Sequence, residues 1–165
     1  LADARYLEVV EVLDHPAAEK APFGQAVRAR SEMGGGWLGW AVSVDDITPF
    51  ETRLERPAAP GSRQFPDGRH LEWCQLGMKG LMADPQLPFF LQWISEALLL
   101  PTALVSDLRL AQIQISGSAE RLSEWLGVPV ADRLDGVQLQ LIAPNGHPGI
   151  TQVTFESPEK GTVVI

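Results

Sequence analysis

The sequence has little cysteine, little positive charge and no long apolar run, and each shortage argues against a class of protein. Cys74 is the single cysteine among 165 residues, which excludes a disulfide within the chain and fits a reducing compartment. The 13 Lys and Arg residues are outnumbered by 21 Asp and Glu residues, and the net charge of −8 argues against binding to nucleic acid. The longest apolar run, around 97–105, contains Pro101 and is too short to cross a bilayer. We therefore expect a cytoplasmic globular protein with neither nucleic acid nor membrane as a partner.

Familiar nucleotide-binding and nucleophile motifs are also missing. The glycine run 34–36 leads into a predicted strand instead of following one, so it is better interpreted as a connector than as a phosphate loop. The segment 116–118 (SGS) is better interpreted as a helix cap than as a serine nucleophile motif. The sequence therefore does not identify a reaction.

The sequence does contain many short strands and a few helices. Apolar alternation predicts strands over 6–13, 37–44, 62–65, 70–76, 87–93, 108–116, 137–143, 150–156 and 162–165. Helices are predicted after Pro22, over 49–55 with a capping box from Thr48 to Glu51, and from Ser118 to a stop at Gly127. The order strand, helix, strand, strand, strand occurs twice. This order predicts an α+β fold of repeated β-α-β-β-β modules.

Several of these segments resemble the glyoxalase-like domain family of the vicinal oxygen chelate (glyoxalase/bleomycin resistance/dioxygenase) superfamily. The resemblance rests on YLEVVEV, GGGWLGWAVSVDDI, FPDGRHLEWCQL, LPFFLQW and the APNG and SPEKGTVVI turns. It implies curved mixed sheets that form a cup for a small ligand, often with a divalent metal.

The same resemblance implies a division of the chain. Residues 1–33 would hold the last strand and following helix of a truncated first module, 34–100 a second module, and 101–165 a third, similar unit. The first module would be incomplete. Either its opening strand and helix precede residue 1, or another subunit completes the sheet, as in a homodimer.

The metal ligands that the resemblance implies are only partly present. By position, Glu8 would be a last-strand carboxylate and Gln92 its counterpart in the next module, whereas Trp40 stands where a histidine would be expected. A hard divalent ion needs several oxygen or imidazole ligands. Glu8 and Gln92 are therefore weak metal candidates, and a divalent metal is expected only if a segment before residue 1 supplies further ligands. The third unit offers other weak candidates: Gln112, Gln114, Gln152 and Glu156.

A second group, His70, Glu72 and Cys74, alternates along one predicted strand and so shares a face. These residue types can bind a transition metal, and a thiol beside a histidine can be a nucleophile. Three residues along one straight strand are too far apart to meet at one ion. We therefore interpret the group as a polar outer face opposite Leu71 and Trp73, with Cys74 as a small apolar residue.

The aromatic residues suggest a ligand cup. In the segment 87–93, Phe90 and Gln92 fall on one face of the predicted strand, and we expect this face to line the cup. We predict a small-molecule-binding protein of unknown specificity whose ligand lies in an aromatic-lined cup. The alternatives are a metal-dependent lyase, isomerase or dioxygenase of the same superfamily, and a structural or interaction domain without a ligand. The predicted ligand-binding residues are Glu8, Trp40, Trp73, Phe90 and Gln92.

Overall fold

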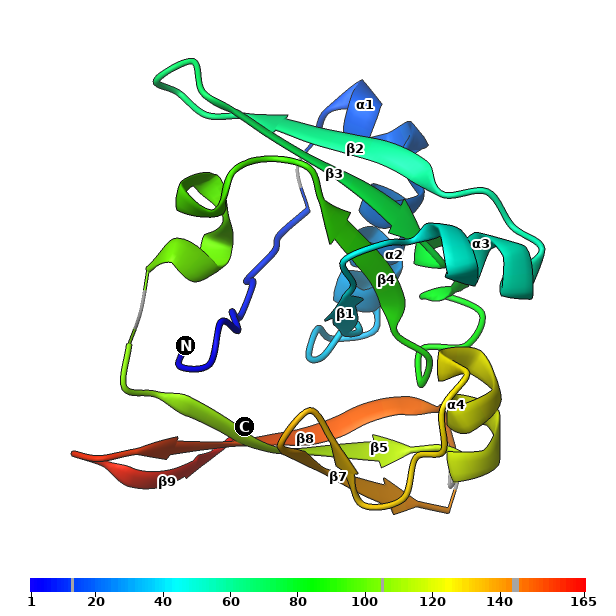
Figure 1. Ribbon diagram of the computed structural model, residues 1–165, viewed down its shortest axis with the longest axis vertical. Helices are drawn as coiled ribbons and strands as arrows, with labels where there is room; N and C mark the ends of the chain where they lie inside the picture. The colour runs from blue at the N-terminus through cyan, green and yellow to red at the C-terminus, as the bar shows by residue number, and fades with distance from the viewer. Residues whose placement is uncertain (13, 105, 144–145) are drawn as a thin grey trace.

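The computed structural model describes residues 1–12, 14–104, 106–143 and 146–165, which form two mixed sheets (Figure 1). The four-stranded sheet has the order β1 (Ala41–Ser43), β4 (Phe89–Trp93), β3 (His70–Leu76) and β2 (Ala59–Gln64). The five-stranded sheet has the order β6 (Arg133–Leu134), β7 (Val137–Ile142), β5 (Arg109–Ser116), β8 (Gly149–Ser157) and β9 (Gly161–Val164). The predicted α+β fold with curved mixed sheets is confirmed.

The four-stranded sheet follows the predicted element order. β1 pairs with β4 in parallel, so that Val42 lies opposite Phe90, and the helix α3 (Thr48–Leu54) connects β1 to β2. The pairs β2–β3 and β3–β4 are antiparallel, and Cys74 lies opposite Gln92. The strand predicted over 37–44 is shorter than expected, since only its last part, β1, is paired.

The five-stranded sheet uses a different strand order. β5 pairs in parallel with β7, after a crossover through α4 (Ala119–Leu126), and in antiparallel with β8. The first strand of this unit is therefore central, whereas β1 is at an edge of the first sheet. The short strand β6, which we did not predict, joins β7 through Asp135 and Gly136, whose φ values of 47° and 78° fit a type I′ turn. The turn predicted at 144–146 lies partly outside the described residues.

The helices begin and end for local reasons. The predicted cap of α4 is confirmed, because the Arg121 amide donates to Ser118 Oγ and Gly127 ends the helix in the left-handed conformation. The α1 (Pro16–Lys20) and α2 (Pro22–Glu32) helices both start with proline. Short 3₁₀ turns, η1 (Met78–Gly80), η2 (Ala97–Leu99) and η3 (Pro101–Ala103), flank β4. Among the described residues, no helix is long and apolar enough to cross a bilayer.

The predicted α3 helix is confirmed, but its predicted capping box is wrong. Thr48 lies inside the helix and Ile47 precedes it as the N-cap residue. The Thr48 amide donates to Asp46 Oδ1 at 2.9 Å. Glu51 does not turn back to the cap, because its carboxylate accepts a hydrogen bond from the Ala58 amide at 2.6 Å. The acidic side chain of the expected box thus fixes the loop after the helix instead.

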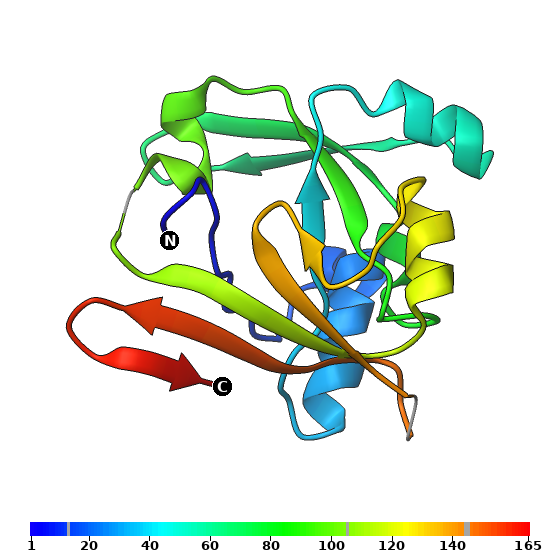
Figure 2. The same cartoon turned by 60° about the horizontal axis from the view of Figure 1, so that its bottom comes forward.

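The strand predicted over 6–13 is wrong for its described part. Residues 6–12 run extended but pair with no described strand, and position 13 lies outside the described residues. A strand is stable only where a neighbouring strand and a buried face support it. Here the apolar side chains Leu7, Val9 and Val10 are 44%, 89% and 37% exposed. The N-terminal segment instead leads from the start of β5, where the Ala2 amide donates to the Leu108 carbonyl, toward α1 (Figure 1 and Figure 2).

One core joins the two sheets. It lies on the sides of the sheets that the helices α3 and α4 cover, and α4 contributes Leu122 and Leu126 to it. Its other buried members are Ile47, Leu76, Phe90, Ile113, Ile115, Val130, Val137 and Leu139. Because the apolar residues of β5 and β7 point inward, the alternate residues of these strands face outward. The outward side of the five-stranded sheet is therefore polar.

Candidate functional site

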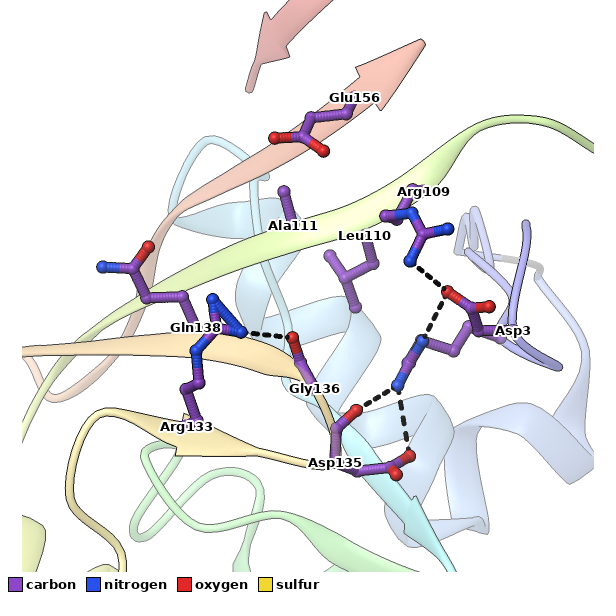
Figure 3. Close-up of a pocket in the computed structure, with 10 residues that line it drawn as sticks. Asp3, Arg109, Leu110, Ala111, Arg133, Asp135, Gly136, Gln138 and Glu156 are labelled. Atoms are coloured by element: carbon purple, nitrogen blue, oxygen red, sulfur yellow. Dashed lines mark hydrogen bonds and ion pairs between the residues drawn. The ribbon is translucent and has the colours of Figure 1, made fainter. Parts of the chain in front are cut away.

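A pocket of about 590 Å³ opens at one end of the five-stranded sheet (Figure 3). Four segments of the chain form it: the N-terminal segment, the start of β5, the β6–β7 hairpin and the end of β8. The lining residues are Asp3, Arg5, Arg109, Leu110, Ala111, Arg133, Asp135, Gly136, Gln138 and Glu156. The lining includes three arginines and three carboxylates, but no aromatic side chain.

Strand pairing places the charged side chains around the pocket. Arg133 on β6 lies opposite Gln138 on β7, and Arg109 on β5 lies opposite Glu156 on β8. Directly opposed residues point to the same side of a sheet. The register of β5 against β8 shifts between Leu110 and Gln112, which leaves Ala111 as an extra residue at the pocket wall.

A chain of ion pairs ties the N-terminal segment to the sheet (Figure 3). The Asp3 carboxylate lies 3.1 Å from Arg109 Nη1 and 3.3 Å from Arg5 Nη1. Arg5 Nη2 in turn lies 3.1 Å from the Asp135 carboxylate and also donates to the Asp135 carbonyl. Arg133 Nη1 donates to the Gly136 carbonyl of its own hairpin at 3.0 Å. Within the described parts of the chain, neither Arg133 nor Glu156 forms an ion pair.

An amide network extends from the pocket along the outward side of the sheet. Gln140 Oε1 accepts hydrogen bonds from Gln112 Nε2 at 2.6 Å and from Gln114 Nε2 at 3.0 Å. Thr151 Oγ1 donates to Gln114 Oε1 at 2.8 Å. These side chains order one another, and Gln138 at the end of the row is exposed and faces the pocket. The arrangement can hold a small polar molecule through charge-assisted and amide hydrogen bonds.

Comparison with known families assigns the fold. Residues 1–130 match the model of the glyoxalase-like domain. The chain belongs to this family. The match confirms the predicted membership of the vicinal oxygen chelate superfamily and covers Arg5 and Arg109, whereas the β6–β7 hairpin with Arg133 follows it. No curated protein and no solved structure gives a significant match.

Two predicted ligand-binding residues of this glyoxalase-like domain lie on the helix side of the first sheet. Phe90 is 0% exposed, and its ring centroid lies 4.4 Å from that of Phe50 on α3. Gln92 Oε1 accepts a hydrogen bond from the Ile47 amide at 3.1 Å, just before α3. Phe90 is therefore enclosed against α3 instead of open to a cup, and Gln92 uses its oxygen to bind the backbone just before α3. Ligand binding by them stays a prediction.

The predicted tryptophans are held by hydrogen bonds to the protein. Trp40 packs against the core, and its Nε1 donates to the Gln86 carbonyl at 3.0 Å. Trp73 Nε1 donates to Gln75 Oε1 at 3.2 Å, and its ring lies edge-on to Trp93 with the centroids 5.9 Å apart. These tryptophans lie apart from the arginine-lined pocket, and their contact with a ligand stays a prediction.

The predicted outer face of His70, Glu72 and Cys74 is wrong, because these residues lie on the side of β3 that also carries the core residue Leu76. The interpretation of Cys74 as a small apolar residue fits its packing. His70 and Glu72 are exposed, and Cys74 is half-buried against the core. Glu72, Trp73 and Cys74 line a smaller pocket of about 340 Å³ between β2 and β3. Among the described residues that line this pocket, Glu72 is the one other ionisable side chain, and no histidine lies there beside the thiol.

The described residues do not fit the divalent metal that the superfamily often uses. Among them, no group of three or more His, Cys, Asp or Glu side chains could hold a metal ion. Glu8 is exposed on the unpaired N-terminal segment, and the Gln92 oxygen already accepts the Ile47 amide. We therefore derive no chemical step through a metal.

Sequence reasoning missed the arginines, which are far apart along the chain. One local signal could have placed Arg133. An Asp-Gly pair between two apolar positions is typical of a two-residue hairpin, and this hairpin puts Arg133 opposite Gln138.

Tyr6 is the single tyrosine, so its ionisation can be followed without interference. Its ring packs against Trp93, with the centroids 6.3 Å apart. Burial and, to a lesser degree, the negative charge of Glu8 raise the pKa of Tyr6 from 10.0 to about 12. We expect the phenolate absorbance of the native protein to appear near pH 12, and that of the urea-unfolded protein near pH 10.

The same shift predicts how stability changes with pH. Because the folded-state pKa is raised, the contribution is fully present below pH 10 and is lost as the pH rises through the interval from 10 to about 12. A native titration that coincides with the unfolded one would show that Tyr6 is solvated, and that the N-terminal segment does not lie against Trp93.

Proposed function

We propose that this glyoxalase-like domain binds a small polar molecule in the arginine-lined pocket at the end of the five-stranded sheet. The observation that carries the proposal is the gathering of charged and amide side chains from four separate segments around about 590 Å³. Pockets for small ligands usually measure roughly 300–1,000 Å³ and place a few polar groups to fix the ligand.

The chemistry of the lining favours a polar ligand over a flat apolar one. Arg5, Arg109 and Arg133 offer fixed arrays of N–H donors, and Gln138 offers both a donor and an acceptor. Apolar contact is limited to Leu110 and Ala111 and the stems of the long side chains. The proposal thus keeps the predicted small-molecule function but moves the site away from the aromatic residues.

The pocket can be tested by filling it. In a heat-stability screen against small metabolites, a ligand present at 100 times its Kd should stabilise the protein by about 2.7 kcal/mol, which raises Tm by roughly 5–10 °C. Ala111→Phe places a ring in the pocket and should remove this shift. Ala59→Phe is the matched control, because Ala59 is exposed on β2, far from the lining residues in the chain and in the fold.

A second variant keeps the test valid if Ala111→Phe fails to fold. Gln138→Leu changes an exposed side chain and should weaken binding without a loss of secondary structure by circular dichroism. If no metabolite raises Tm, or if the shift survives both Ala111→Phe and Gln138→Leu, the proposal fails. The former outcome would favour a structural or interaction domain.

A further inference from the structure

We infer that the ligand of this pocket carries an oxyanion, a carboxylate or a phosphate group, that binds Arg109, and that Asp3 occupies the oxyanion position in the free protein. The inference rests on the proposed function and names the class of ligand.

The contact between Asp3 and Arg109 is of the kind that the oxyanion of a ligand would make with Arg109. The Asp3 carboxylate lies 3.1 Å from Arg109 Nη1 and comes from a segment that is not part of the sheet. The cross-strand neighbour of Arg109, Glu156, does not reach it within ion-pair distance. In the described part of the chain, Asp3 is therefore the carboxylate that forms an ion pair with Arg109. The planar guanidinium suits carboxylate and phosphate oxygens alike.

The backbone that presents Asp3 is strained. Asp3 and Ala4 have φ values of 57° and 52°, which place two consecutive residues other than glycine in the left-handed region. Such conformations cost free energy and persist where other contacts hold them. Here the Ala2 amide donates to the Leu108 carbonyl at 2.9 Å, and Arg5 is anchored to Asp135. The Ala2 carbonyl also accepts a hydrogen bond from the Arg5 amide at 3.3 Å, so backbone contacts hold the turn and the Asp3 side chain can leave Arg109 without a change of the turn.

The charged side chains next to Arg109 indicate which other groups the ligand carries. Arg133 forms no ion pair among the described residues and contributes a second cation to the same pocket. The Arg109 side chain is 58% exposed, so an incoming oxyanion can reach it. The Glu156 carboxylate on the same side would repel further negative charge and accept a hydrogen bond. The ligand therefore combines one oxyanion with a hydroxyl or ammonium donor.

The test replaces Asp3, which competes with the ligand for Arg109. Isothermal titration would use lactate and glycerol phosphate as probes, so that the two arms distinguish carboxylate from phosphate. Loss of an exposed ion pair is worth little, so Asp3→Asn should lower the Kd of the bound probe roughly two- to fivefold. Arg109→Gln should abolish binding.

Asp67→Asn is the matched control. It removes a carboxylate that pairs with Arg69 at 2.7 Å in the β2–β3 hairpin, outside the pocket lining, and the asparagine oxygen can still accept from the Arg69 amide. The Kd should therefore stay at the native value.

A second measurement does not depend on any ligand. Phenylglyoxal modifies accessible arginines, and peptide mass spectrometry gives the rate at Arg109. This rate should rise in Asp3→Asn and stay unchanged in Asp67→Asn. An unchanged rate at Arg109 in Asp3→Asn overturns the role of Asp3.

The failure of the inference differs from the failure of the proposed function. If a neutral metabolite stabilises the protein through Ala111 and Gln138 while neither oxyanion probe binds, the oxyanion assignment is wrong and the pocket function stands. If no compound of any class binds, the pocket function itself is wrong.

Discussion

Replacement of Phe90 by alanine is expected to lower the free energy of unfolding by about 3–5 kcal/mol, because the change removes a buried ring and leaves a cavity. Phe90 is 0% exposed, and its ring centroid lies 4.4 Å from Phe50 and 6.0 Å from Trp125. These partners come from α3 and α4, so the cavity would lie where the two halves of the chain meet. Urea denaturation followed by tryptophan fluorescence measures the loss.

Phe65→Ala is the matched control for Phe90→Ala. Phe65 lies at the β2–β3 hairpin, is half-buried, and stacks with Arg63 and Arg69 at 5.7 and 5.1 Å. Its replacement should cost about 1 kcal/mol. Similar losses for the two variants would show that Phe90 is not enclosed, which would restore the prediction that it lines an open cup.

Replacement of Gly77 by alanine is expected to lower the free energy of unfolding by about 2–5 kcal/mol. Gly77 ends β3 with a φ of 95°, a conformation that costs other residues about 1–2 kcal/mol. A Cβ atom there would lie 2.9 Å from Trp125 Cζ2 and 3.5 Å from Phe89 Cα. Crowding of this kind typically adds about 1–3 kcal/mol. The ring cannot move freely, because Trp125 Nε1 donates to the Pro88 carbonyl at 2.7 Å.

Gly80→Ala is the corresponding control. Gly80 follows three residues later in η1, a Cβ there meets no atom within 4 Å, and its φ is not positive. Its replacement should change the free energy of unfolding by no more than about 0.5 kcal/mol. Equal stability of Gly77→Ala and Gly80→Ala would mean that α4 does not pack against the end of β3.

Elements with a strong local signal were predictable from the sequence. β3 alternates polar and apolar residues from His70 to Trp73, β5 does so from Gln112 to Ser116, and α4 has a serine cap and a glycine stop. The family resemblance was predictable too, because its motifs are contiguous segments. These signals act over a few residues, which is the range over which sequence patterns specify structure.

The wrong predictions concern which neighbour a strand pairs with and which face of a strand is covered. Residues 6–12 have strand propensity, but a strand also needs a neighbour, and no pattern within the segment provides one. Alternation put Phe90 and Gln92 on one face correctly, yet it could not say which face α3 covers. The pairing of β5, β7 and β6 brings Arg109 and Arg133 to the pocket, and an ion pair with Asp135 brings in Arg5 from more than a hundred positions upstream. The spacing of these arginines in the sequence does not indicate this arrangement.

The composition of β2 has a consequence for how the protein behaves at high concentration. β2 is an edge of the four-stranded sheet, and open edges can recruit strands of other molecules into aggregates. Pro60 lacks the amide hydrogen that such a strand would need, and the exposed Arg63 adds a charge that a growing stack would have to bury. This edge is thereby protected against the addition of further strands.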